Sequence, residues 1–171
     1  MIDWYRKVLG MTINHRSAAL GGPRNGPWHS ATFVSNNEVN HRIVFFEMPG
    51  LVLDPDKRRH ARLQHVAFEY ETLDDLLGTY ARLKCLGILP VLAADQGLQS
   101  SVYYLDPDQN SVELNVNNYG NEGTATEHIK NSSSKLAYVD PDKMLAARNA
   151  GASPWELWLC WVCLHWRALA A

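Results

Sequence analysis

Residues 63–70 read LQHVAFEY, and this stretch decides the fold class of the chain. Its alternate positions differ in character, with Val66 and Phe68 on one side and His65 and Glu69 on the other. Successive side chains of a β-strand point to opposite faces, so this alternation predicts a strand with one apolar and one more polar face.

A helix signal follows the strand directly. Thr72 stands three residues before Asp75 as a capping pair, and apolar residues then recur at helical spacing up to Gly87, a residue type that commonly ends helices. Three further strands are predicted, at residues 88–92, 101–105 and 111–116. The turn 106–110 joins the last two, and the order of elements is βαβββ.

The first fifty residues carry a weaker copy of this pattern. KVLGM at residues 7–11 matches KCLGI at residues 84–88, where a helix ends and leads into a strand. Strands are predicted around residues 31–35 and 42–48. A strand precedes the helix in the second copy, but the first copy begins within the helix, so we expect the first module to lack its first strand.

These patterns predict an α+β fold built from paired βαβββ modules. The predicted domains are an incomplete first module (1–50), a linker (51–62), a second module (63–119) and a C-terminal appendage (120–171). Within the appendage we expect a short helix at residues 141–149 before a Trp-rich tail. Cys160 and Cys163 in that tail have no second cysteine pair, and we interpret them as packing residues rather than a zinc site.

Composition narrows the class of function. The chain has 171 residues, 46% of them hydrophobic, and a net charge of -2. It has no dense basic run beyond residues 57–59, no apolar signal segment at its start, and a tail too short to span a bilayer comfortably. With only three cysteines, we expect a cytoplasmic protein whose partners are small molecules, not nucleic acid or membrane.

One histidine and one glutamate are candidates for metal chemistry. His65 lies on the less apolar face of its strand, and Glu113 points away from its neighbours Val112 and Leu114, so both could line one concavity. Imidazole and carboxylate suit Fe(II) or Mn(II), as two members of a facial triad that leaves positions open. A lone histidine on a strand is more often structural, so the pattern alone leaves both interpretations open.

Residues 102–114 read VYYLDPDQNSVEL. Together with residues 63–69 and the capped helix, this stretch resembles the second module of one-domain type I extradiol ring-cleavage dioxygenases of the biphenyl-2,3-diol kind. These enzymes belong to the glyoxalase/bleomycin resistance/dioxygenase superfamily, the vicinal oxygen chelate proteins. The family signature of Tyr, Asp-Pro and Glu is matched by Tyr103, 106–107 and Glu113. Residues 4–11 resemble the helix of the family's first module, so the resemblance covers about residues 1–120.

The resemblance implies a role for four residues. His65 and Glu113 match two metal ligands, Tyr103 matches the tyrosine near the substrate hydroxyl, and His41 matches the acid/base histidine that shuttles a proton during ring cleavage. The implied cofactor is Fe(II), with Mn(II) as the alternative. The implied substrates are O2 and a catechol-like aromatic diol, which places the protein in aromatic compound catabolism.

Three departures from the family pattern affect these expectations. The third ligand is a histidine on the strand that we expect to be missing, Gln96 stands where the signature has a histidine, and Gln109 stands where the turn has glycine. We therefore expect weak metal binding and impaired turnover. Gln109 needs a turn that tolerates a side chain, at a mild cost if its φ is positive.

Two rival functions remain open at this point. A glyoxalase-type metal isomerase or lyase uses the same fold without oxygen chemistry, and Tyr103 with His41 argues against it. A degenerate, metal-free small-molecule-binding protein would keep the fold and a hydrophobic cleft, and the missing strand argues for it. The sequence does not select a particular diol, and it leaves assembly into a homo-oligomer open.

Overall fold

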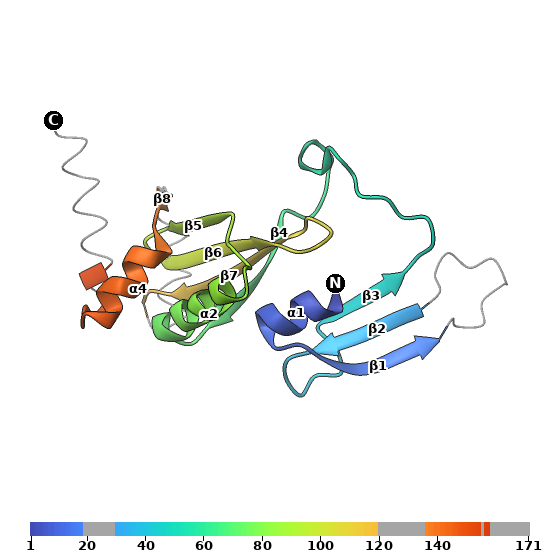
Figure 1. Cartoon of the computed structure of the whole chain (residues 1–171), viewed down its shortest axis with the longest axis horizontal. Helices are drawn as coiled ribbons and strands as arrows, with labels where there is room; N and C mark the ends of the chain where they lie inside the picture. The colour runs from blue at the N-terminus through green and yellow to red at the C-terminus, as the bar shows by residue number, and fades with distance from the viewer. Residues whose placement is uncertain (19–29, 120–135, 155, 158–171) are drawn as a thin grey trace. The chain divides into compact units, whose positions relative to one another are not determined.

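The computed structural model describes residues 1–18, 30–119, 136–154 and 156–157 (Figure 1). The chain divides into two compact units, Met1–Arg62 with Asp106–Gln109, and Leu63–Leu105 with Asn110–Ala171. Each unit has its own β-sheet and its own helix packed on it, which confirms the predicted α+β class.

The first unit is a helix followed by three strands. They are α1 (Ile2–Leu9), β1 (Thr12–Ala18), β2 (Ser30–Ser35) and β3 (Ile43–Glu47), and a 3-10 turn, η1 (Lys57–Arg59), follows. The strands pair antiparallel in the order β1-β2-β3. The strands predicted around residues 31–35 and 42–48 are confirmed as β2 and β3.

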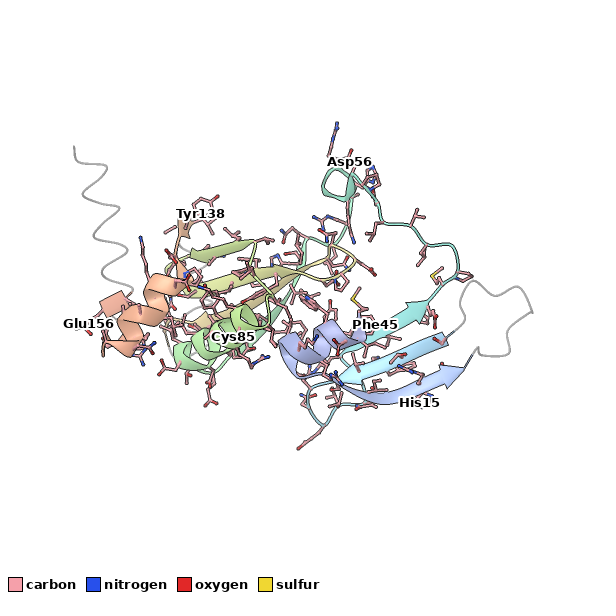
Figure 2. The ribbon with its side chains drawn as sticks, viewed as in Figure 1. His15, Phe45, Asp56, Cys85, Tyr138 and Glu156 are labelled. Atoms are coloured by element: carbon pink, nitrogen blue, oxygen red, sulfur yellow. The ribbon has the colours of Figure 1, made fainter. Side chains whose placement is uncertain are left out.

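Helix α1 packs on this sheet through its apolar face. Tyr5, Val8 and Leu9 are its buried residues. The ring of Tyr5 lies 5.1 Å from that of Phe45 on β3, centroid to centroid. Phe45 is labelled in Figure 2. Gly10 ends the helix with a φ of 65°, a left-handed conformation that glycine adopts without steric cost.

The second unit holds one five-stranded sheet. Its elements are β4 (His65–Tyr70), α2 (Leu73–Cys85), β5 (Leu92–Asp95), β6 (Gln99–Leu105), β7 (Ser111–Asn117), β8 (Ala137–Tyr138) and α4 (Pro141–Asn149). The strand order is β4-β7-β6-β5-β8. Strand β4 pairs parallel with β7, and the other neighbours are antiparallel.

Helix α2 covers one face of this sheet, as the capping pair and the leucine spacing predicted. The Thr72 hydroxyl accepts a hydrogen bond from the backbone N–H of Asp75 at 3.1 Å. The buried side chains of the helix are Leu73, Leu76, Leu77, Tyr80 and Leu83. The sheet contributes Val112, Leu114 and Val116, all at most 4% exposed. Burial of these apolar side chains against one another stabilises the unit.

The prediction of a strand at residues 88–92 was wrong, because β5 begins only at Leu92. The backbone N–H of Ile88 donates to Leu83 O at 2.9 Å, so it still closes the end of α2. Pro90 has no N–H to give to a strand ladder. Strand β6 in turn begins at Gln99, earlier than predicted, because Gln96 N donates to Gln99 O at 2.9 Å and closes a turn at Gly97.

The predicted helix at residues 141–149 is confirmed as α4. It docks on α2 through side chains of opposite charge. The Lys84 ammonium lies 2.6 Å from Asp142 Oδ1, which also accepts from the Tyr80 hydroxyl at 2.7 Å. Arg148 pairs with Asp74 at 2.6 Å.

The Trp-rich tail with Cys160 and Cys163 lies outside the described residues. No helix in the described ranges has the length and apolar character needed to cross a membrane.

Candidate metal centre

Three neighbouring strands of the second unit place the predicted ligands on one face of the sheet. Glu113 of β7 is partnered by Ala67 on β4 and by Tyr103 on β6. Residues two apart on a strand share a face, so His65 lies on the same side as Ala67, and Ser101 on the same side as Tyr103. The opposite side carries the apolar residues beneath α2.

His65 and Glu113 contact each other on this face, as the alternation of polar and apolar residues predicted. His65 Nε2 lies 2.8 Å from Glu113 Oε2. The imidazole side chain is 37% exposed, whereas the carboxylate side chain is 2% exposed. His65 Nδ1 contacts Oε1 of Gln64. If Nδ1 carries the proton that Gln64 accepts, Nε2 is the nitrogen that can bind a metal beside Glu113. Without a metal, a proton on Nε2 makes the 2.8 Å contact a hydrogen bond to Glu113.

The pair fits a divalent metal in donor type and in spacing. Two ligand atoms bound at about 2.0–2.2 Å and at right angles lie about 3 Å apart. The 2.8 Å between Nε2 and Oε2 is close to that separation. Within the described residues, however, no group of three or more His, Cys, Asp or Glu side chains comes together as a metal site. Metal ligation by the pair therefore stays a prediction.

The second oxygen of Glu113 is bound by two donors from β6. Glu113 Oε1 accepts from the Ser101 hydroxyl at 2.6 Å and from Gln99 Nε2 at 2.8 Å. Gln99 Nε2 also lies 3.1 Å from Ser101 Oγ, so the three side chains form one network. Hydrogen bonds of this kind compensate the cost of burying a carboxylate.

Tyr103 lies beside the pair. Its ring meets that of His65 edge-on, with 5.8 Å between centroids. Burial, followed by the nearby charge of Glu113, raises the pKa of Tyr103 above its ordinary value. The hydroxyl is therefore protonated at neutral pH and able to donate a hydrogen bond. Gln96, which replaces the histidine of the family signature, has its Nε2 3.5 Å from this hydroxyl.

His41, the predicted acid/base residue, belongs to the first unit. It is exposed in the loop between β2 and β3, and its ring lies 5.3 Å from the ring of Phe33, centroid to centroid. The ring of His15 on β1, a residue labelled in Figure 2, lies 5.7 Å from the same phenyl ring, centroid to centroid. Because His41 and the His65–Glu113 pair lie in different units, the catalytic role of His41 stays a prediction.

In the turn between β6 and β7, Gln109 has a positive φ, the conformation for which a mild cost was expected. Gln109 is the only non-glycine residue with a positive φ, 65°, among the described residues. Its backbone N–H donates to Asp106 O at 2.8 Å, and Asp108 N donates to the Asp106 side chain at 3.0 Å. The turn thus forms with a side chain in a conformation that favours glycine.

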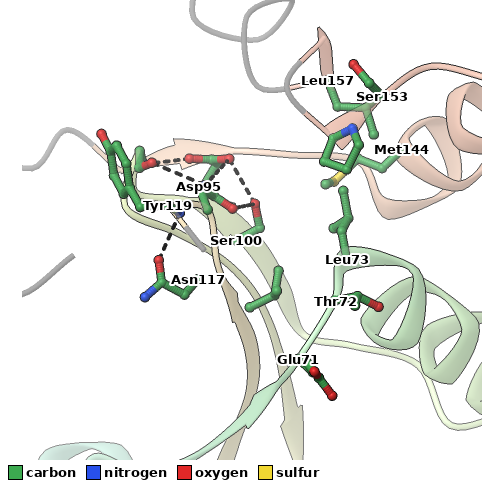
Figure 3. Close-up of a pocket in the computed structure, with 14 residues that line it drawn as sticks. Glu71, Thr72, Leu73, Asp95, Ser100, Asn117, Tyr119, Met144, Ser153 and Leu157 are labelled. Carbon is green, nitrogen blue, oxygen red and sulfur yellow. Dashed lines mark hydrogen bonds between the residues drawn. The ribbon is translucent and has the colours of Figure 1, made fainter. Parts of the chain in front are cut away.

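A cavity of about 390 Å³ lies on the opposite face of the same sheet, between the sheet and the helices (Figure 3). Asp95 is its buried carboxylate, and burial raises the pKa of that group. The carboxylate accepts hydrogen bonds from Gly97 N and from the side chains of Ser100 and Asn118. The residues that line the cavity include the carboxylates Glu71 and Asp95, and neither His65 nor Glu113 is among them.

Sequence reasoning did not single out Gln99 or Ser101. Alternation along the strand is the signal that could have found them. Each precedes Tyr103 by an even number of positions, so on one strand they share its face. The predicted strand began at Ser101, so it included Ser101 but left out Gln99.

Comparisons with known proteins agree with the resemblance in the sequence. The model of the Glyoxalase/Bleomycin resistance protein/Dioxygenase superfamily matches residues 1–114. Biphenyl-2,3-diol 1,2-dioxygenases 3 and 2 of Rhodococcus globerulus are 32% and 33% identical to the chain over 129 residues. Each match covers 75% of this chain and 62% of the relative, so the chain spans less than two thirds of the length of these relatives.

A solved structure shows the same fold. The glyoxylase/bleomycin resistance protein/dioxygenase domain from Frankia sp. EAN1pec matches with a TM-score of 0.54. The identity is 19%, and the match covers 70% of this chain and 82% of that one. At this identity the likeness concerns the fold alone.

Proposed function

The chain belongs to the glyoxalase/bleomycin resistance protein/dioxygenase superfamily, and from that premise we propose that it is an extradiol dioxygenase-like oxidoreductase. It would use Fe(II), or Mn(II), and O2 to cleave a catechol-like aromatic diol. Support for the reaction class comes from the names of the two similar dioxygenases and from the residues that line the candidate metal centre.

The observation that carries this proposal is the 2.8 Å contact between His65 Nε2 and Glu113 Oε2. Neutral nitrogen and anionic oxygen are the donors of the facial triad that binds non-haem iron. A divalent iron at this position would supply the redox chemistry that joins diol and oxygen. Weak binding is expected from these residues alone, because the described part of the chain offers no third His, Cys, Asp or Glu beside them.

The remaining roles follow from the chemistry of the side chains. Tyr103 is protonated at neutral pH, as a tyrosine with the ordinary pKa of about 10 already is, and its raised pKa extends this to higher pH. Its hydroxyl would donate a hydrogen bond to an oxygen of the bound diol. His41 would take and return the proton that ring cleavage requires, a task suited to an imidazole near neutral pH. The half-exposed ring of His65 leaves the substrate a route to the site.

Anaerobic loading with Fe(II), followed by metal analysis and exposure to a catechol in air, tests the proposal. We expect sub-stoichiometric iron that rises with the Fe(II) concentration, and slow formation of a yellow ring-opened product. In Glu113→Ala, the bound iron and the rate of product formation should each fall by more than about tenfold, because one of the two metal ligands is removed.

His60→Ala is the matched control for this experiment. His60 Nδ1 lies 2.5 Å from Asp54 Oδ2, so it forms another imidazole–carboxylate pair, but both side chains are exposed. Its removal should leave iron binding and turnover unchanged. Equal iron binding by Glu113→Ala and wild type would overturn the proposed site.

A metal-free binding function is the second candidate. The observation that favours it is again the lack of a three-residue ligand group within the described ranges. In that case the chain would bind no iron under any loading condition and would still bind an aromatic diol, as isothermal titration with catechol would measure.

A further inference from the structure

The Glu113 carboxylate is held asymmetrically, with its two oxygens in different surroundings. Oε1 accepts two hydrogen bonds, from Ser101 and from Gln99, whereas Oε2 faces His65 Nε2. The side chain is 2% exposed, so bulk water does not replace these partners. Turning the carboxylate about its last bond would break both hydrogen bonds at Oε1.

From this geometry we propose that Ser101 and Gln99 are positioning residues, which fix Glu113 through Oε1 and so present Oε2, beside His65, to a divalent metal. The inference rests on the proposed metal site. It adds the residues that hold one ligand in place, and neither of them would touch the metal.

The donor and acceptor roles in this network are mutually consistent. A carboxylate only accepts hydrogen bonds, so the amide nitrogen of Gln99 and the hydroxyl hydrogen of Ser101 must point at Oε1. The Gln99 amide has a second hydrogen, which the Ser101 oxygen accepts at 3.1 Å. Ser101 is 1% exposed, so solvent water does not compete for the hydrogen bonds of its hydroxyl.

The register of the sheet holds the network together. Ser101 and Gln99 lie on β6 opposite Asn115 and Asn117, and Glu113 lies on the neighbouring strand β7 on the same face. Both positioning side chains therefore reach Glu113 from a rigid strand. Hydrogen-bond partners of this kind orient a ligand before the metal binds, and their loss typically lowers metal affinity about 10–100-fold.

Neighbouring Ser100 provides a matched control. It is also a buried serine on β6, and its hydroxyl also donates to a carboxylate, Asp95 Oδ2, at 2.9 Å. It lies on the opposite face of the sheet, against the cavity in Figure 3. Ser100→Ala and Ser101→Ala thus remove the same group from the same strand, and only Ser101→Ala touches Glu113.

The experiment is a Mn(II) titration of the full chain, in which electron paramagnetic resonance measures the free aqueous ion. We expect Ser101→Ala to bind Mn(II) about tenfold or more weakly than wild type. Ser100→Ala should bind within about twofold of wild type. Ser101→Thr keeps the hydroxyl and should recover most of the affinity, which a loss of packing alone would not predict.

Circular dichroism and thermal unfolding establish that each variant is folded. If Ser101→Ala fails to fold, Gln99→Leu replaces it in the Mn(II) titration. This variant removes the other donor to Glu113 Oε1, and Gln99 is only half-buried, so the substitution disturbs the core less. Equal affinities of Ser101→Ala, Ser100→Ala and wild type would overturn this inference while leaving the metal site standing. A wild-type chain that binds no Mn(II) would overturn the metal site itself and this inference with it.

Discussion

Gln109 is the residue at which the backbone conformation conflicts most directly with the side chain. Its φ of 65° lies in the left-handed region, where a Cβ atom crowds the following carbonyl oxygen. We expect Gln109→Gly to raise the free energy of unfolding by about 0.5–1 kcal/mol, with part of the relieved strain offset by the greater freedom of glycine in the unfolded chain.

Urea unfolding followed by circular dichroism measures this effect. Gln109→Ala is the control, because it removes the side chain beyond Cβ and keeps the Cβ atom. Its free energy of unfolding should stay within about a few tenths of a kcal/mol of wild type. A gain in Gln109→Ala equal to that in Gln109→Gly would show that the side chain, rather than the backbone, carries the strain.

The candidate site was only partly predictable at the scale of single residues. The juxtaposition of His65 and Glu113 followed from alternation, because each is the polar position in an apolar strand. Ser101 and Gln99 carry no such contrast, since β6 is polar on both faces near its start. Their relation to Glu113 depends on the pairing register of β6 with β7, which is a tertiary property.

At the scale of elements, α2 was predicted well because its signals are local. Its cap, its leucine spacing and its terminal glycine all lie within the helix and its ends. The start of β5 was not predicted, because Ile88 is β-branched and apolar yet gives its N–H to the end of α2. Local propensity cannot show which of two hydrogen-bond partners a backbone group will take.

The cap of α2 supports a prediction at this scale. The Thr72 hydroxyl accepts from the backbone N–H of Asp75, a group that would otherwise have no partner in the first turn. Thr72→Ala should lower the free energy of unfolding by about 1 kcal/mol. Thr72→Ser keeps the acceptor and should stay within a few tenths of a kcal/mol of wild type in the same denaturant titration. If both variants lost equal stability, the contribution would come from the methyl group instead.

For the whole molecule, four buried tyrosines among the described residues predict how stability depends on pH. Burial is the largest cause that raises the pKa of Tyr5, Tyr80, Tyr103 and Tyr104 above the ordinary value. Above about pH 10 the unfolded chain ionises these phenols while the folded chain still holds their protons. Their contribution to stability is therefore complete below about pH 10 and is lost as the pH rises through the folded pKa values.

Tyr104→Phe tests this pH dependence, because the Tyr104 hydroxyl is buried without a hydrogen-bond partner among the described residues. Removing it should leave stability at pH 7 unchanged or higher by about 1 kcal/mol. The decline of stability between about pH 10 and 11 should become shallower. Tyr138→Phe, at a position that is 68% exposed, should decline as wild type does. Identical alkaline profiles for Tyr104→Phe and wild type would contradict the assignment.

The parallel pairing of β4 with β7 has a kinetic consequence. These strands are the first and last of residues 63–119, so their pairing closes a loop that contains α2, β5 and β6. Closing a loop of this length costs conformational entropy, and contacts within the loop do not offset that cost. Contacts between residues far apart in the sequence therefore slow folding. His65 and Glu113 are brought together by this one pairing. The proposed site therefore forms only when β4 and β7 pair. An ion bound there would chiefly lower the unfolding rate and would change the folding rate little.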